Sequence, residues 1–219
     1  RWITMSRLYP VYLDLAGRPV LVVGGGRVAA RKARRLQECG ADLTIVAPRI
    51  IDQLRELGEC PNVTTCVRPY QSPDIEGVWL VVAATGDNAL NRRISGEAEA
   101  AGAFCNVVDE PELCSFHVPA VMRRGLLQLA ISTGGASPAL ARRLRKQLEK
   151  QFGPSYGHLM GALARLRREV KRTFPDDQTA RRDALEGFLD SGIPEILLDD
   201  NDYESFDREL IEWISDLQG

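Results

Sequence analysis

The sequence lacks any long apolar run. A membrane span requires about 18 uninterrupted apolar residues, and no stretch of the 219 residues approaches that length. The first ten residues, RWITMSRLYP, also lack the apolar centre of a signal peptide. We therefore expect no membrane partner and a cytoplasmic location.

Metal-binding and disulfide patterns are missing as well. The five cysteines are odd in number and form no Cys-x-x-Cys pair, which argues against a disulfide framework and a zinc knuckle. The two histidines, His117 and His158, have no other ligand-type residue at metal-site spacing, so we predict no structural metal. For His117 a structural hydrogen bond is the simpler interpretation, and a contact with a ligand stays open.

Charge is distributed unevenly along the chain, although the net charge is only −2. Residues 115–175 carry 12 Lys and Arg against 2 Asp and Glu, whereas residues 176–219 carry 3 against 14. Such a basic block is typical of a nucleic-acid site, of a site for a small anion, or of a solvated helix face matched to the acidic tail. Aromatic residues are not interleaved with the arginines, which argues against nucleic acid.

A glycine cluster is the most informative pattern that is present. The apolar run 20–23 leads into Gly24, Gly25 and Gly26, and an amphipathic helix pattern continues to Ala41. The spacing Gly-x-Gly-x-x-Ala, with the helix N-terminus behind it, suits a bound pyrophosphate, although a similar turn can also simply join strand to helix. From this motif we assign six residues to cofactor binding: Gly24, Gly25, Gly26, Arg27, Val28 and Ala29.

The end of the second predicted strand departs from the usual dinucleotide pattern. About twenty residues after the glycines, many such folds carry an acid for the adenosine ribose, but this chain has Ala47, Pro48 and Arg49. Arg49 would bind a 2′-phosphate, stack on adenine or point to solvent, so NADP is not excluded. We add these three residues and Thr85 to the predicted cofactor site.

Strand and helix patterns alternate up to residue 114. Strands are predicted at 20–23, 41–48, 62–70, 78–85 and 103–109, with helices at 27–41, 50–59 and 88–102. This rhythm predicts an α/β fold with a Rossmann-like, doubly wound parallel sheet over residues 1–114. In such a sheet Gly24, Thr85 and Asp109 would lie in the crevice at the carboxyl ends of the strands.

The pattern changes after residue 114. Two strand-like runs, 115–124 and 125–133, precede a helix that begins near Pro138, and the remainder is helical with proline and aspartate breaks. We predict a dimerisation region at 115–153, a layer too small to bury its own apolar face, and a helical domain at 154–219.

Five segments together resemble one family. They are GGGRVAARKARRL, VVAATGDNALN, FCNVVDEPELCSFHVPA, LAISTGGASP and ALARRLRKQLE. Their order resembles precorrin-2 dehydrogenase, also called sirohydrochlorin ferrochelatase, the N-terminal half of siroheme synthase. The resemblance covers roughly residues 8–172, and the chain length suggests the stand-alone form.

The resemblance implies NAD-dependent oxidation of precorrin-2 to sirohydrochlorin, with ferrous iron as a further substrate in those members that insert it. It places Asp109 on the family's general base, and a helix cap or turn is the alternative role for this residue. It also implies a homodimer and an anionic tetrapyrrole substrate that suits the basic block. We assign Asn106, Ser115, Ser132, Thr133 and Gly134 to substrate binding.

Two other functions compete with this one. A non-catalytic, NAD-binding regulatory module would have the same fold without needing Asp109 or the basic block. A short-chain reductase would need Tyr-x-x-x-Lys, and no tyrosine of this chain has lysine four residues later.

Overall fold

The computed structural model describes residues 8–217. It divides into two compact units, Arg1–Val118 and Pro119–Gly219, each with its own apolar core. The first seven residues, on which part of the signal-peptide interpretation rests, lie outside the described residues. The predicted subdivision of the second unit at residue 153 stays a prediction.

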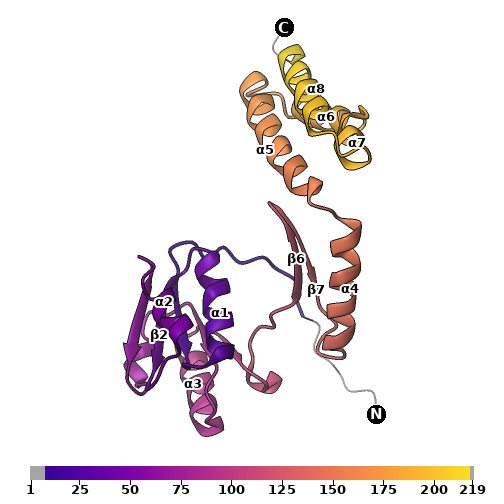
Figure 1. Cartoon of the computed structure of the whole chain (residues 1–219). Coiled ribbons are helices and arrows are strands. Elements are labelled where there is room, and N and C mark those ends of the chain that lie inside the picture. The colour runs from indigo at the N-terminus through magenta and orange to yellow at the C-terminus, as the bar shows by residue number, and fades with distance from the viewer. Residues whose placement is uncertain (1–7, 218–219) are drawn as a thin grey trace. The chain divides into compact units, whose positions relative to one another are not determined.

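A five-stranded parallel sheet forms the centre of the first unit (Figure 1). Its strands are β1 Pro19–Val23, β2 Asp42–Ala47, β3 Val63–Val67, β4 Leu80–Ala83 and β5 Phe104–Val107. Their order is β3-β2-β1-β4-β5, so the connection reverses direction next to β1. The predicted Rossmann-like sheet is confirmed, and this reversal marks the crevice where such sheets bind ligands.

Helices cover both faces of this sheet because successive side chains of a strand point to opposite faces. The helices are α1 Arg27–Glu38, α2 Asp52–Leu57 and α3 Asn88–Ala100, with the short 3₁₀ turns η1 Ser72–Ile75 and η2 Pro111–Leu113. Val20 and Val22 of β1 pack in one cluster with Ala29 of α1, and Leu21 packs in another with Ile94 of α3. Both faces are dry, which explains why the strands read as continuous apolar runs.

The second unit begins with a hairpin and continues as helices. Strands β6 Ala120–Arg124 and β7 Leu127–Ile131 pair antiparallel, and Gly125 supplies the left-handed residue of the two-residue turn with φ 55°. The helices are α4 Pro138–Gln151, α5 Ser155–Thr173, α6 Gln178–Leu189, α7 Ile193–Leu198 and α8 Tyr203–Asp216. The two strand-like runs predicted at 115–124 and 125–133 are the two strands of this hairpin.

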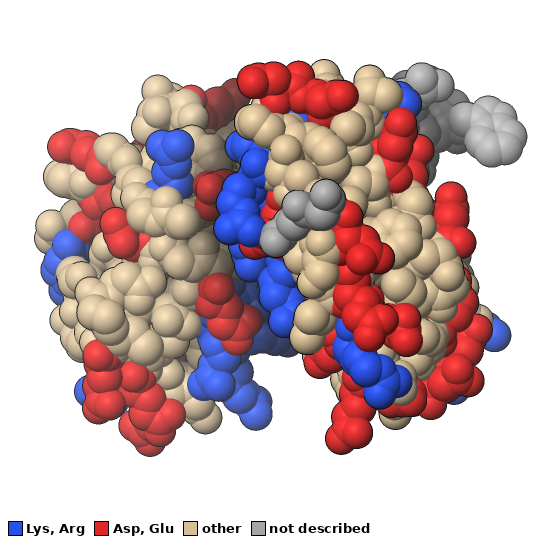
Figure 2. All heavy atoms as spheres, turned by 90° about the horizontal axis from the view of Figure 1, so that it is seen from above, with Lys and Arg blue, Asp and Glu red and all other residues tan. Residues whose placement is uncertain are grey.

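The acidic tail folds onto the basic helix α5. Leu166 of α5 is buried together with Phe188 of α6 and Phe206 of α8. His158 and Arg165 of α5 lie 2.9 Å and 3.4 Å from the Asp207 carboxylate. Figure 2 shows acidic side chains prominent over these C-terminal helices. The tail is thus a structural complement of α5, one of the open interpretations of the basic block.

No helix within residues 8–217 is long and apolar enough to cross a bilayer.

Candidate active site

Two glycines let the β1–α1 loop lie against the ends of the neighbouring strands. Gly24 has φ 137°, and a β-carbon there would come 2.3 Å from the Ala84 carbonyl oxygen. At Gly25 a β-carbon would come 1.7 Å from the Arg49 carbonyl oxygen. The Gly24 amide also donates to the Val46 carbonyl at 2.9 Å. Any side chain would therefore push the loop out of the crevice.

The N-terminus of α1 opens toward solvent beside this loop. Gly26 is the N-cap, no side chain caps the helix there, and nothing lies within 4 Å of the β-carbon position. Ala29 and Ala33 are fully buried, which brings α1 close to the sheet. The first amide groups of α1 are therefore available to an anion, with the helix dipole favouring negative charge.

A cavity of about 1030 Å³ extends from this loop along the carboxyl ends of the strands. It is lined by Val23, Gly24, Gly25, Gly26, Val46, Ala47, Pro48, Arg49, Pro69, Tyr70, Ala84, Thr85, Gly86, Asp87, Ala89, Leu90 and Arg93. Seven of the ten predicted cofactor residues are among them. The other three are not: Arg27 lines a separate groove on α1, Val28 is partly exposed, and Ala29 packs on the sheet.

An aromatic and charged wall closes the side of the cavity near α3. The Tyr70 hydroxyl donates to Glu97 at 2.6 Å, and the Arg93 guanidinium lies 5.2 Å from the Tyr70 ring centre and 3.3 Å from Glu97. Burial and the Glu97 carboxylate raise the pKa of Tyr70, and the hydrogen bond from Tyr70 lowers the pKa of Glu97. The tyrosine thus stays neutral, and its buried ring forms part of the cavity wall.

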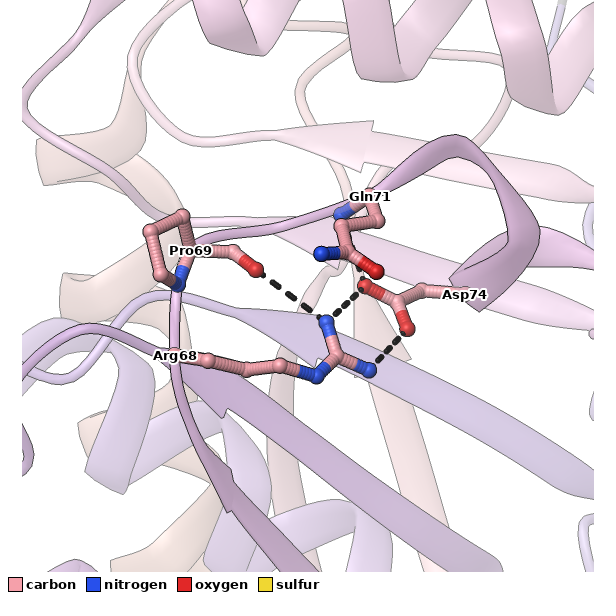
Figure 3. Close-up of polar contacts among 4 residues, drawn as sticks. All are labelled: Arg68, Pro69, Gln71 and Asp74. Atoms are coloured by element: carbon pink, nitrogen blue, oxygen red, sulfur yellow. Dashed lines mark hydrogen bonds and ion pairs between the residues drawn. The ribbon is translucent and has the colours of Figure 1, made fainter.

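An ion pair fixes the segment that carries Tyr70 (Figure 3). The two terminal nitrogens of Arg68 donate to Asp74 at 2.8 and 2.5 Å, and one of them also donates to the Pro69 carbonyl at 3.1 Å. Asp74 further accepts from the backbone amide of Gln71 at 2.8 Å. The hydrogen bond from Arg68 lowers the pKa of Asp74. Pro69 and Tyr70 are therefore held at the cavity edge by a bidentate pair.

Thr85 and Asp87 shape the turn between β4 and α3. The Thr85 hydroxyl donates to the Asn91 side chain at 2.7 Å, and Asp87 caps α3 by accepting from the Ala89 and Leu90 amides at 2.9 and 3.1 Å. The carboxylate that lines this cavity is thus occupied by the helix. Arg49, which follows β2, also lines the cavity, and it is exposed.

A polar cluster lies at the carboxyl end of β5. Asp109 is exposed and has φ 62°, a strained left-handed conformation for a residue other than glycine. Asn106 is buried, accepts from the Lys32 ammonium at 3.1 Å, and donates to the Phe116 carbonyl at 3.1 Å. Strained residues of this kind cluster at active sites and ligand-binding sites.

The other predicted substrate residues make local hydrogen bonds. Ser115 pairs with β5, since its hydroxyl accepts from the Cys105 amide at 2.7 Å and its amide donates to the Cys105 carbonyl at 2.9 Å. In the second unit the Ser132 hydroxyl accepts from the Gly134 amide and the Thr133 hydroxyl from the Ser137 amide, both at 3.1 Å. They form the turn before α4, with Gly134 at φ 59°.

Neither histidine joins a metal-type cluster in the described part of the chain. Across residues 8–217 no three His, Cys, Asp or Glu side chains are grouped so as to hold a metal ion. His117 is exposed, whereas His158 pairs with Asp207.

Sequence reasoning missed the wall of the cavity and the lysine beside Asn106. Pro69 and Tyr70 lie two and three residues after the end of β3, so the rule that ligands bind at carboxyl ends would have indicated them. Arg93 and Lys32 lie within helices, where their charges look like ordinary solvent-facing positions.

The fold and cavity define a dinucleotide-binding protein of the Rossmann type: a glycine loop too tight for side chains, an open helix N-terminus and a cavity at the strand reversal. Three family models match the chain: NAD(P)-binding at residues 11–120, the central region of sirohaem biosynthesis proteins at 124–151, and the sirohaem synthase dimerisation region at 155–212.

Similar proteins agree with these matches. Siroheme synthase of Ectopseudomonas mendocina (strain ymp) is 49% identical over 172 residues, and that of Pseudomonas fluorescens (strain SBW25) is 45% identical over 172 residues. Each alignment covers 78% of this chain but only 37% of the relative, so the chain corresponds to about a third of those proteins. The solved structure of SirC, precorrin-2 dehydrogenase, is 28% identical with a TM-score of 0.77, covering 95% of this chain and all of that one. The chain belongs to the NAD(P)-binding siroheme synthase and precorrin-2 dehydrogenase family.

Proposed function

We propose that this protein is an NAD-dependent precorrin-2 dehydrogenase that oxidises precorrin-2 to sirohydrochlorin. The observation that carries the proposal is the placement of a dinucleotide cavity and the strained, exposed Asp109 at the same edge of one sheet. The likeness to SirC over nearly the whole chain supports it.

The division of labour in this reaction follows from the site. The oxidation removes one hydride and one proton from the substrate. A nicotinamide cofactor, when bound, supplies the acceptor for the hydride. Its pyrophosphate would be held by Gly24, Gly25 and the first amides of α1. Its adenosine half would lie against the wall that contains Tyr70. Asp109 would take the proton, because it is the exposed carboxylate at the end of β5.

The proposal includes NAD as the acceptor, and Arg49 decides how well NADP competes. It also includes the substrate roles of Asn106, Ser115, Ser132, Thr133 and Gly134, a homodimer formed through residues 115–153 and a cytoplasmic location. Ferrous iron would enter as a second substrate, and the assay below tests its insertion separately.

The test is an anaerobic assay of the purified protein with precorrin-2 and NAD. We expect NADH to form together with the sirohydrochlorin spectrum. A siroheme spectrum that exceeds the protein-free control after addition of ferrous iron would show chelatase activity. The assay is repeated with NADP. Binding of NAD without turnover with NAD or NADP would contradict the proposal and favour a regulatory module.

Asp109→Asn is the matched variant, because asparagine tolerates the left-handed conformation but is not a base. We expect turnover to fall by at least about 100-fold, the lower range for loss of general base catalysis. Cofactor affinity and thermal stability should stay unchanged. Full activity of Asp109→Asn would remove this carboxylate from the mechanism.

A further inference from the structure

Lys32 projects from the middle of α1 toward the end of β5 instead of into solvent. Its ammonium group donates to the Asn106 side-chain oxygen at 3.1 Å across 74 positions of sequence. It is half-buried, whereas Arg31, Arg34 and Arg35 on the same helix are exposed. Removing a lysine ammonium from water in this way costs free energy, and a solvent-facing lysine on the same helix would avoid that cost.

The contact determines the orientation of the Asn106 amide. The Asn106 nitrogen donates to the Phe116 carbonyl at 3.1 Å and lies 3.5 Å from the Cys114 sulfur. A flipped amide would place its NH₂ group against the ammonium and its oxygen against the carbonyl. Both contacts would then be repulsive, so the charged lysine allows one orientation only.

The charges around Lys32 come from three elements. Burial lowers the pKa of Lys32 from its ordinary value of 10.5, and Arg31 and Arg35 of α1 lower it further. Cys114, after η2, and Asp109, after β5, act in the opposite direction. The ammonium is thus held in place by its hydrogen bond to Asn106, while burial and its own helix disfavour the charged form.

We propose that Lys32 is a positioning residue of this site: its ammonium group fixes the Asn106 amide on the strand that leads to Asp109. This inference rests on the proposed dehydrogenase function for its kinetic test only. Lys32 does not line the cavity at the glycine loop, so its proposed role concerns the end of β5 and not the binding of the cofactor.

Three substitutions separate the contributions of the lysine. Lys32→Met keeps the length and removes charge and donor, and Lys32→Gln keeps a donor without charge. Lys32→Arg keeps both, and its charge persists at alkaline pH. The control is Arg34→Met, an exposed position on the same helix.

We expect Lys32→Met to lower kcat on the order of tenfold, the loss that corresponds to one charged hydrogen bond, with the KM for NAD unchanged. In the unsubstituted protein kcat should fall at alkaline pH with a midpoint below 10.5, because the ammonium loses its proton there. Lys32→Arg should retain most of the rate and move this midpoint upward by about one pH unit or more. A merely structural lysine would not produce that shift.

A second readout does not depend on turnover. Nitrogen NMR of the Asn106 side-chain amide should show slow hydrogen exchange in the unsubstituted protein and in Lys32→Arg, and faster exchange in Lys32→Met. The inference is overturned if Lys32→Met keeps the full kcat, or if its Asn106 amide exchanges as slowly as before. Absence of turnover in the unsubstituted protein would instead overturn the proposed function, and the amide exchange would still decide the role of Lys32.

Discussion

Gly25 and Arg49 are joined by backbone contact. A β-carbon on Gly25 would overlap the Arg49 carbonyl oxygen, and the Gly25 carbonyl accepts from the Ile51 amide at 3.0 Å. The glycine loop and the turn after β2 therefore hold each other in position. Arg49 is consequently fixed by its backbone at the edge of the cavity, while its side chain stays exposed.

This placement gives a prediction for Arg49→Glu. The Asp87 carboxylate is occupied in capping α3, whereas Arg49 is exposed at the cavity edge, and in the proposed function it would meet a 2′-phosphate on the adenosine ribose. The KM for NADP should rise by at least about tenfold in this variant, while the KM for NAD changes by less than about threefold. Steady-state kinetics with both cofactors measures this, and Arg34→Glu controls for charge reversal at an exposed site. Equal effects on the two cofactors would show that Arg49 does not contact a 2′-phosphate.

Single residues were predictable where their local pattern was sufficient. The glycines precede a helix and follow an apolar strand, so their role could be inferred from neighbouring residues. The left-handed backbone of Asp109 could not, because the residues Val108 to Pro111 contain no glycine that would indicate a positive φ. The contact of Lys32 with Asn106 likewise depends on how α1 packs on the sheet.

At the scale of elements, the segment between β3 and β4 has no regular strand or long helix to hold it. Its position depends on the Arg68–Asp74 pair and on the contacts of Tyr70 and Ser72 with Glu97 of α3. Since Pro69 and Tyr70 line the cavity, this pair connects local stability to ligand binding.

Asp74→Asn tests the connection. NAD affinity should fall by roughly three- to tenfold, because the segment with Tyr70 loosens. The pKa of Asp74 is lowered by Arg68, so the contribution of this carboxylate is complete well above pH 3.8 and disappears as the pH falls through the lowered value. The difference in thermal stability between the two proteins should therefore vanish in acid. Asp52→Asn, which changes an exposed partner of Arg55 3.6 Å away, is the control. A difference that persists in acid would contradict the ion-pair explanation.

Element boundaries were predicted best where the apolar pattern stops. The strand predicted from residue 115 begins instead at Ala120, because Ser115 hydrogen-bonds to β5 and Pro119 has no amide hydrogen to donate to a ladder. Helix α7 has only six residues and follows Gly192 in the left-handed conformation, so it is too short for a periodic pattern.

At the scale of the whole molecule, the two units differ in how completely they bury their apolar residues. In the hairpin and α4, only Met122 and Ala141 are buried among the described apolar residues. Leu126, Leu140 and Leu144 are 70%, 47% and 36% exposed. A second copy of the chain is the occupant that we propose for this face, because a two-stranded sheet has unpaired edges and one open face.

Light scattering at micromolar concentration should therefore report a dimer, and Leu140→Glu combined with Leu144→Glu should convert it to a monomer. Burying two unpaired carboxylates in an apolar interface is strongly unfavourable in free energy. The dissociation constant of the dimer should therefore rise more than about tenfold. The control is Ile211→Glu, which places a carboxylate at a 64% exposed position of α8 within the matched dimerisation region 155–212. If Ile211→Glu separates the subunits and the leucine pair does not, the interface lies on the C-terminal helices and our placement at 115–153 is wrong. If only the leucine double variant becomes a monomer, the hairpin and α4 form the interface. The charge at position 211 would then be tolerated because α8 lies outside that interface.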